Sequence, residues 1–176
     1  MPKLISEKTV FETKYIHINE TTVKLTSGKI AHYHYLYLGE SAMMVPIDNK
    51  GEVILIKEYF QTLNTVQLSL PKGRFERGHN AKQTANKELQ EEIGYKAEKL
   101  DKLAVVTSAP GYVKLKTHIF LARNLKESKL DGDWDEEIEL VPTSFKKIDR
   151  LISEGKITES RVIAALLLAK QYLKIK

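Results

Sequence analysis

Residues 72–95, KGRFERGHNAKQTANKELQEEIGY, constrain the fold more than any other part of the chain. A glycine-bearing loop leads into a segment with helical periodicity, and Asn80 with Gln83 three residues later has the form of a capping box. Gly94 follows as the type of residue that ends a helix in the left-handed conformation. These signals predict a helix over residues 81–93, entered from a loop.

Three glutamates, Glu88, Glu91 and Glu92, cluster on this predicted helix within an arc of roughly 100°. The arc borders the apolar side formed by residues 81, 85, 89 and 93, so the carboxylates are expected to be half-buried. Like charges four residues apart repel, and half-buried acids without a partner are costly. A shared Mg²⁺ or Mn²⁺ would remove that cost. The alternative is a solvated acidic face, because glutamate is a good helix former.

The loop and helix together resemble the signature of the Nudix hydrolases. The positions that match at the signature spacing are Gly73, Glu88, Leu89, Glu91, Glu92 and Gly94. Three positions depart from it, with His79 in place of Glu, Lys87 in place of Arg and Tyr95 in place of an aliphatic residue. In the family that Glu and Arg brace the loop against the helix, so we expect this ion pair to be lost here.

The resemblance covers about residues 10–173. The stretches GESAMMVPID, EVILIKEYFQ, SLPKGRFERG and SAPGY are similar in sequence and order to the ADP-ribose pyrophosphatase group. Two features of that group are absent, because Ser69 replaces a Glu and Phe60 replaces an Arg. In SLPKG and SAPGY the chain is more similar to the bacterial ADP-compounds hydrolase branch.

The resemblance implies an α/β fold, an α/β/α sandwich with a mixed sheet and an N-terminal β-hairpin extension. Alternating apolar residues and turn signals predict the strands and helices. Strands are expected at residues 22–25, 30–38, 42–47, 53–59, 66–70, 103–107, 116–122 and 137–141, and further helices at 144–153 and 160–173. Residues 1–40 are expected to form a dimerisation region, and residues 41–176 the Nudix domain.

The resemblance also implies roles for individual residues around a divalent cation. Glu88 and Glu92 are the expected metal ligands, and Glu91 is either a further ligand or the holder of a metal-bound water. The backbone carbonyl of Lys72 is expected to complete the site. Amide groups around Gly73 are expected to approach phosphate, since glycine leaves room for a ligand.

A general base is expected in the acidic segment 131–137, because the group carries a catalytic glutamate in a mobile loop after the signature. Glu136 is the first candidate and Glu137 the second. The alternative is that the segment is simply solvated. Other expected substrate contacts are Lys57, Arg74, Pro110, Gly111 and Tyr112.

Composition bounds the remaining possibilities. A chain of 176 residues with 42% hydrophobic and 29% charged residues is typical of one globular domain. No cysteine is present, which is permissive of a reducing cytoplasm. The first residues lack the apolar core of a signal peptide, and the longest apolar run is too short to span a bilayer. The net charge of +5 comes with no nucleic-acid-binding motif, and an anionic small substrate explains it as well.

Together with these observations, the resemblance implies a Mg²⁺- or Mn²⁺-dependent pyrophosphohydrolase of ADP-containing nucleotides that works in the cytoplasm as a homodimer. The expected substrates are ADP-ribose, and also NADH and diadenosine polyphosphates, cut to release AMP. The alternatives are another nucleoside-diphosphate-sugar hydrolase and a non-catalytic nucleotide sensor. No nucleic-acid partner and no membrane association are expected.

Overall fold

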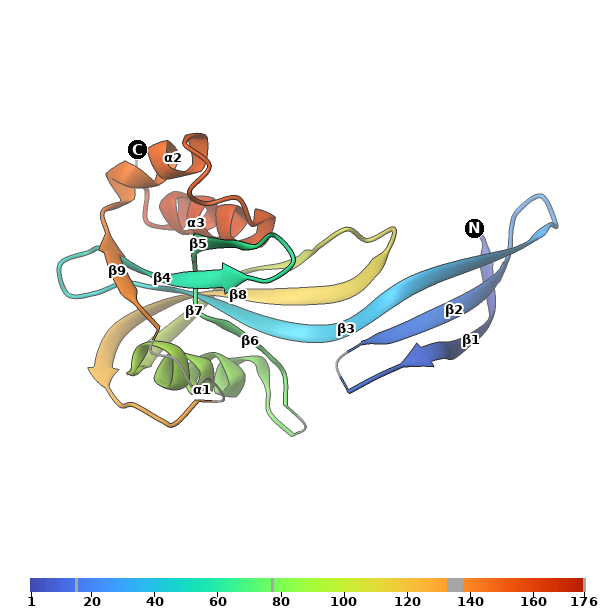
Figure 1. Cartoon of the computed structure of the whole chain (residues 1–176), viewed down its shortest axis with the longest axis horizontal. Coiled ribbons are helices and arrows are strands. Elements are labelled where there is room, and N and C mark those ends of the chain that lie inside the picture. Colours follow the sequence, from blue (N-terminus) through green and yellow to red (C-terminus); the bar gives the residue numbers. More distant parts are fainter. Residues whose placement is uncertain (15, 77, 133–137, 176) are drawn as a thin grey trace. The chain divides into compact units, whose positions relative to one another are not determined.

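The structure, a computed structural model, describes residues 1–14, 16–76, 78–132 and 138–175. Strands and helices follow one another along the chain without a regular alternation (Figure 1). Their order is β1 (Lys3–Glu12), β2 (His17–Lys24), β3 (Ile30–Pro46), β4 (Val53–Phe60), β5 (Thr65–Ser69), β6 (Lys72–Arg74), α1 (Ala81–Ile93), β7 (Tyr95–Thr107), β8 (Val113–Glu127), β9 (Leu140–Thr143), α2 (Phe145–Ser153) and α3 (Ser160–Tyr172). The chain divides into two compact units: unit 1 is Met1–Glu40 with Thr107–Lys116, and unit 2 is Ser41–Val106 with Thr117–Lys176.

Unit 1 is built on an antiparallel arrangement of β1, β2 and the first part of β3. Glu12 pairs with His17 across the β1–β2 turn, and Ile18 pairs with Leu36 across the next pair of strands. No strand was expected at the position of β1, and β2 begins five residues before its expected start at residue 22. Every residue of β1 is exposed, so the strand lacks the alternation of apolar and polar residues by which a strand is recognised.

A second expectation, that of two separate strands where the structure has β3, is wrong. Two strands with a break at residues 39–41 were expected, but the structure has one continuous strand from Ile30 to Pro46. Gly39 has a positive φ of 75°, which glycine adopts without strain, and the strand continues through it. Beyond the glycine, Ser41 pairs with Arg74 of β6, and this pairing holds the backbone extended where the sequence resembles a turn.

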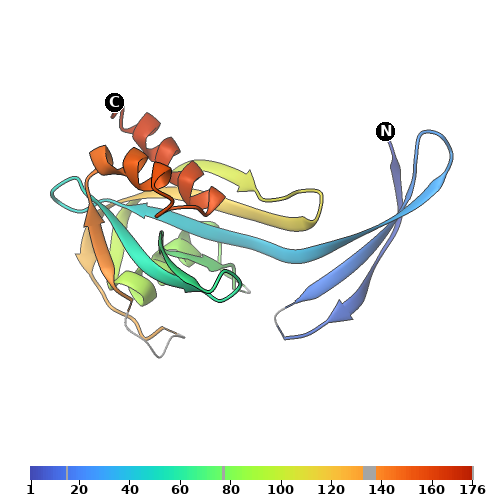
Figure 2. The same ribbon diagram turned by 45° about the horizontal axis from the view of Figure 1, so that its top comes forward.

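Unit 2 has a core on both faces of its sheet strands, with α2 and α3 over one face and α1 over the other (Figures 1 and 2). Alternate residues of β3 serve the two sides: Met43 and Val45 belong to the core of α2 and α3, while Ala42 and Met44 belong to the core of α1. Strands β4 and β8 alternate in the same way, so all three are buried on both faces. The expected α/β fold, a sandwich with a mixed sheet and three helices, is confirmed.

Helix α1 begins and ends where the capping signals predict. Asn80 Oδ1 accepts hydrogen bonds from the backbone N–H groups of Lys82 at 3.0 Å and Gln83 at 3.1 Å. Gln83 Oε1 accepts one in return from the Asn80 N–H at 2.9 Å, which completes the capping box. Gly94 ends the helix with a left-handed φ of 77°. These caps fix the position along the chain at which α1 presents its acidic residues.

The two C-terminal helices also lie close to the expected ranges, with Ser144 and Glu159 as their N-caps. Strands β7 and β8 are longer than expected. Their additional residues mix polar, exposed positions with half-buried ones, so no apolar run marks them in the sequence. Strand β9 starts at Leu140 rather than at residue 137, which lies outside the described residues. Across the described segments, no helix is long and apolar enough to cross a membrane.

Candidate active site

The candidate site begins where β6 passes the face of α1. A Cβ atom on Gly73 would overlap the carboxylate of Glu88, and its backbone is not in the left-handed region. Glycine is therefore required here for close approach between strand and helix rather than for an unusual φ. Strand β6 is held in place by β3, since Ala42 pairs with Gly73. The Glu88 carboxylate thus lies directly against the loop that precedes the helix.

Glu92 lies one helical turn beyond Glu88 and is drawn to the residue before Gly73. The backbone N–H of Lys72 donates a hydrogen bond to Glu92 Oε2 at 2.9 Å. Burial raises the pKa of the Glu92 carboxyl to about 8, and the negative charges of Glu88 and Glu58 act in the same direction. The positive charge of Lys72 and its backbone hydrogen bond act in the opposite direction. Glu92 is thus an acid that needs more positive charge than the protein supplies.

The ammonium of Lys72 is the cation that the chain places among these acids. It forms an ion pair with Glu58 of β4, and it lies 3.1 Å from Ser69 Oγ and 5.6 Å from the centre of the Phe60 ring. Ser69 and Phe60 are the two positions at which the sequence departs from the ADP-ribose pyrophosphatase group, and both departures therefore meet at Lys72. Sequence reasoning missed Glu58, whose only signal was an acid near the end of the apolar strand over residues 53–59.

An acid at a position other than that of the signature braces the loop against the helix. Lys87 Nζ lies 2.6 Å from Glu76 Oε1 in the loop, and His79 Nδ1 lies 3.4 Å from Glu76 Oε2. The carboxylates of Glu76 and Glu91 both raise the pKa of Lys87, and the Lys87 hydrogen bond lowers the pKa of Glu76. Glu76 was not a candidate for this ion pair, because the family signature has its loop acid at position 79. An acid three residues before His79 was the available signal.

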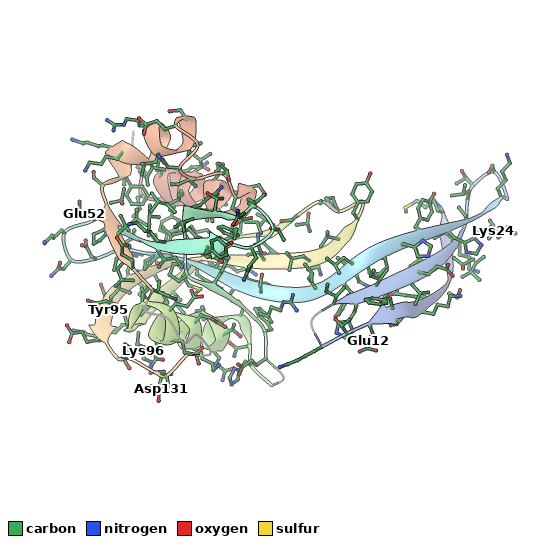
Figure 3. The ribbon with its side chains drawn as sticks, viewed as in Figure 1. Glu12, Lys24, Glu52, Tyr95, Lys96 and Asp131 are labelled. Atoms are coloured by element: carbon green, nitrogen blue, oxygen red, sulfur yellow. The ribbon has the colours of Figure 1, made fainter. Side chains whose placement is uncertain are left out.

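Glu91 is held by this brace. Its Oε1 atom lies 3.0 Å from Lys87 Nζ, and its side chain is 15% exposed. A Cβ on Gly132 would lie 3.4 Å from the Glu91 Cβ, so the segment after β8 packs on this part of α1. The N–H of Leu130 donates to the carbonyl of Gln90 at 3.2 Å, and Figure 3 places Asp131 beside α1. The predicted base-bearing segment therefore starts next to Glu91.

The remaining predicted residues are dispersed. Glu136 and Glu137 lie outside the described residues. Lys57 forms an ion pair with Glu139 at 2.7 Å, and Arg74 is exposed on β6. The predicted substrate turn belongs to unit 1, where Pro110 and Gly111 line a cavity of about 440 Å³ and Tyr112 is 77% exposed.

The arrangement combines a half-buried carboxylate of raised pKa with further oxygen donors. Glu92 and Glu88 lie against the backbone of residues 72 and 73, as the predicted metal site requires. Within the described ranges, no three His, Asp or Glu side chains are already arranged as a metal site. Carboxylate and carbonyl oxygens are the donors that hard divalent cations prefer, so the residues fit such an ion chemically.

Comparison with known proteins identifies the family of the chain. The NUDIX domain family matches residues 38–166, and the chain belongs to this family. The ADP-ribose pyrophosphatase of Bacillus subtilis (strain 168) is 27% identical over 99% of this chain and 93% of its own length. The ADP compounds hydrolase NudE of Escherichia coli (strain K12) is 28% identical over 98% of this chain and 94% of its own length.

A solved structure of an ADP compounds hydrolase superposes on this fold with a TM-score of 0.89. It is 28% identical in sequence, and the match covers 98% of this chain and 94% of that one. These matches confirm the expected resemblance and the expected enzyme class, a Nudix pyrophosphatase.

Proposed function

We propose that this chain is a metal-dependent pyrophosphohydrolase that cleaves ADP-ribose and related ADP-containing nucleotides and releases AMP. NADH and diadenosine polyphosphates are proposed as further substrates. The observation that carries the proposal is the position of two carboxylates of α1: Glu92 accepts a hydrogen bond from the Lys72 N–H at 2.9 Å, and Glu88 lies directly against Gly73. The raised pKa of Glu92, about 8, is consistent with this position. The names of the full-length relatives supply the substrate class, since two of them act on ADP-ribose or ADP compounds.

The proposed cofactor is Mg²⁺ or Mn²⁺, held by Glu88 and Glu92 with the carbonyl of Lys72. Glu91 is a further ligand or orients a bound water. A divalent ion supplies charge neutralisation of the pyrophosphate and a bound water of lowered pKa. A buried acid of raised pKa fits this role, because a bound cation offsets the cost of burying its charge. The carboxyl group then loses its proton more readily and binds the cation as a carboxylate.

The chain's own residues have separate tasks in this proposal. Backbone N–H groups around Gly73 bind phosphate, while the space that a side chain on residue 73 would need holds the Glu88 carboxylate. Arg74 and Lys57 supply positive charge to the diphosphate. Lys57 must first leave Glu139, with which it is paired at 2.7 Å. Glu136, or alternatively Glu137, takes the proton from the attacking water. Support for that assignment is that the preceding Gly132 packs against Glu91.

Residues 1–40 are proposed to form a homodimer contact, with 41–176 as the catalytic domain. Strand β1 ends the strand order and is exposed along its whole length, and such an edge can pair with another chain. Large apolar side chains on it are also exposed, among them Leu4, Val10 and Phe11. Light scattering on the wild-type chain and on Val10→Asp with Phe11→Asp tests this: a dimer that becomes a monomer supports it, and a wild-type monomer refutes it.

Pro110, Gly111 and Tyr112 are proposed to line the nucleotide site. Nucleotides of this kind are cytoplasmic metabolites, and we propose the cytoplasm as the compartment. A non-catalytic sensor is the second candidate, favoured by the departures at His79 and Lys87. A hydrolase of another nucleoside diphosphate sugar is the third.

One assay separates these candidates. The protein is incubated with Mg²⁺ and, in parallel, ADP-ribose, NADH, diadenosine polyphosphates and a uridine diphosphate sugar, and the products are resolved by chromatography. The proposal expects AMP from the adenine compounds with wild-type protein and at least about 100-fold less with Glu92→Gln. Binding without turnover in either protein supports the sensor, and turnover of only the uridine sugar supports the third candidate.

A further inference from the structure

Three charged side chains form a continuous row of ion pairs from the loop to the helix. Glu76 in the loop contacts Lys87 at 2.6 Å, and Lys87 contacts Glu91 at 3.0 Å on the next turn of α1. The loop end of this row of ion pairs has one further contact, because the His79 N–H donates a hydrogen bond to the Glu76 carbonyl at 3.1 Å. The loop is therefore tied to the helix through Lys87, which pairs with a carboxylate on each of them.

At the helix end of this row of ion pairs, the Glu91 side chain has little freedom to move. Its side chain is 15% exposed and Gly132 covers its Cβ, while Lys87 approaches from one turn earlier on the helix. The side chain of Lys87 is 30% exposed, and its ammonium is shared between two carboxylates. If Glu76 were removed, Lys87 would keep one carboxylate and gain rotational freedom, and the position of Glu91 would change with it.

We propose that Glu76 is a positioning residue, which acts through Lys87 to hold the Glu91 carboxylate and the loop that carries Gly73. The inference rests on the proposed hydrolase function. The family signature has its loop acid at the position of His79, and this chain has moved the acid to residue 76. The two positions remain neighbours in space, since His79 Nδ1 lies 3.4 Å from Glu76 Oε2.

A merely structural ion pair would behave differently from a positioning one. The Glu76 side chain is half exposed, and pairs of that kind contribute little to the free energy of unfolding. Small displacements of a group at a reacting centre, in contrast, can lower the rate by up to about 100-fold. The inference therefore expects a loss of kcat without a matching loss of stability.

The test compares kcat, KM and Tm of the full chain with ADP-ribose and Mg²⁺. In Glu76→Gln we expect kcat to fall about 10- to 100-fold, with KM changed less than about threefold and Tm nearly unchanged. The double variant with Lys87→Met should be no slower than Lys87→Met alone, because both act through one contact. An acid restored at the signature position, in Glu76→Gln with His79→Glu, should return kcat to within about threefold of wild type.

The control variant is Glu98→Gln, since Glu98 is an exposed acid on β7 that takes no part in the pairing of Glu76, Lys87 and Glu91, and it should match wild type. The inference is overturned if Glu76→Gln keeps wild-type kcat, if the losses multiply in the double variant, or if His79→Glu fails to rescue. In each of these cases wild-type turnover and its loss in Glu92→Gln leave the proposed function intact. A wild-type protein without turnover overturns both.

Discussion

The carboxylate of Glu88 fills the space that a side chain on residue 73 would need. At residue 73, strand β6 and helix α1 are therefore in contact through the strand backbone and an acid of the helix. The pairing of Ala42 with Gly73 holds the strand at that distance. This contact puts a carboxylate next to backbone amide and carbonyl groups, the combination that a metal and a phosphate need.

Gly73→Ala should displace the Glu88 carboxylate without unfolding the protein. The side chain in the way is the far end of a flexible glutamate, and residue 73 does not have a positive φ, so Tm should stay level or rise slightly. The affinity for Mn²⁺, measured by calorimetry, should fall about 10-fold or more. In a Glu88→Ala background the same substitution should have almost no further effect, and an equal second loss would contradict the contact.

Metal binding should be coupled to the ionisation of Glu92. Because its folded pKa is about 8, the carboxyl is protonated at pH 6 and must lose that proton to act as a ligand. The apparent affinity for Mn²⁺ should rise from pH 6 to pH 8, by at most about tenfold per unit, and then level off. Glu92→Gln should bind weakly with a flat profile, and a flat wild-type profile would refute the coupling.

The same raised pKa sets the sign of a stability change in the metal-free protein. Between pH 4.5 and 8 the folded state holds the Glu92 proton more tightly than the unfolded state. Its contribution is therefore most favourable at low pH and is lost as pH rises to about 8. In urea denaturation, the difference in free energy of unfolding between Glu92→Gln and wild type should grow over that range, and a constant difference would contradict it.

Lys72→Met should destabilise the protein by about 1–3 kcal/mol at pH 7, because it leaves Glu58 without its ion-pair partner beside Glu92. Urea denaturation is the measurement. Lys82→Met is the matched control, since Lys82 is an exposed lysine on α1, and it should stay within about 0.5 kcal/mol of wild type. Equal effects of the two substitutions would mean that the Lys72 ammonium has no structural role.

Local signals allowed the helix and its acids to be placed from sequence, because capping boxes and helical periodicity involve neighbours along the chain. The boundaries of α1 at Asn80 and Gly94 are of this kind. The continuity of β3 depends on a partner distant in sequence, since Arg74 lies opposite Ser41. Strand β1 pairs with its neighbour β2, but every residue of β1 is exposed and no buried apolar pattern marks it.

The candidate site divides in the same way. Glu88, Glu91 and Glu92 follow from their spacing on one helix. Glu58 and Glu76 enter the site through β4 and through a loop, and their contacts with Lys72 and Lys87 could be seen only in three dimensions. The family signature has its acid at the position of His79, so a comparison by position did not indicate Glu76. The carboxylate of Glu76 nevertheless pairs with Lys87.

The most direct test of the account is the binding of Mn²⁺, followed by electron paramagnetic resonance, in the presence of a non-hydrolysable methylene analogue of ADP-ribose. The account predicts that wild-type protein binds the ion and that Glu88→Gln with Glu92→Gln weakens this binding at least about 100-fold. If the double variant held Mn²⁺ as tightly as wild type, the carboxylates of α1 would not be the metal ligands and the proposed chemistry would be wrong.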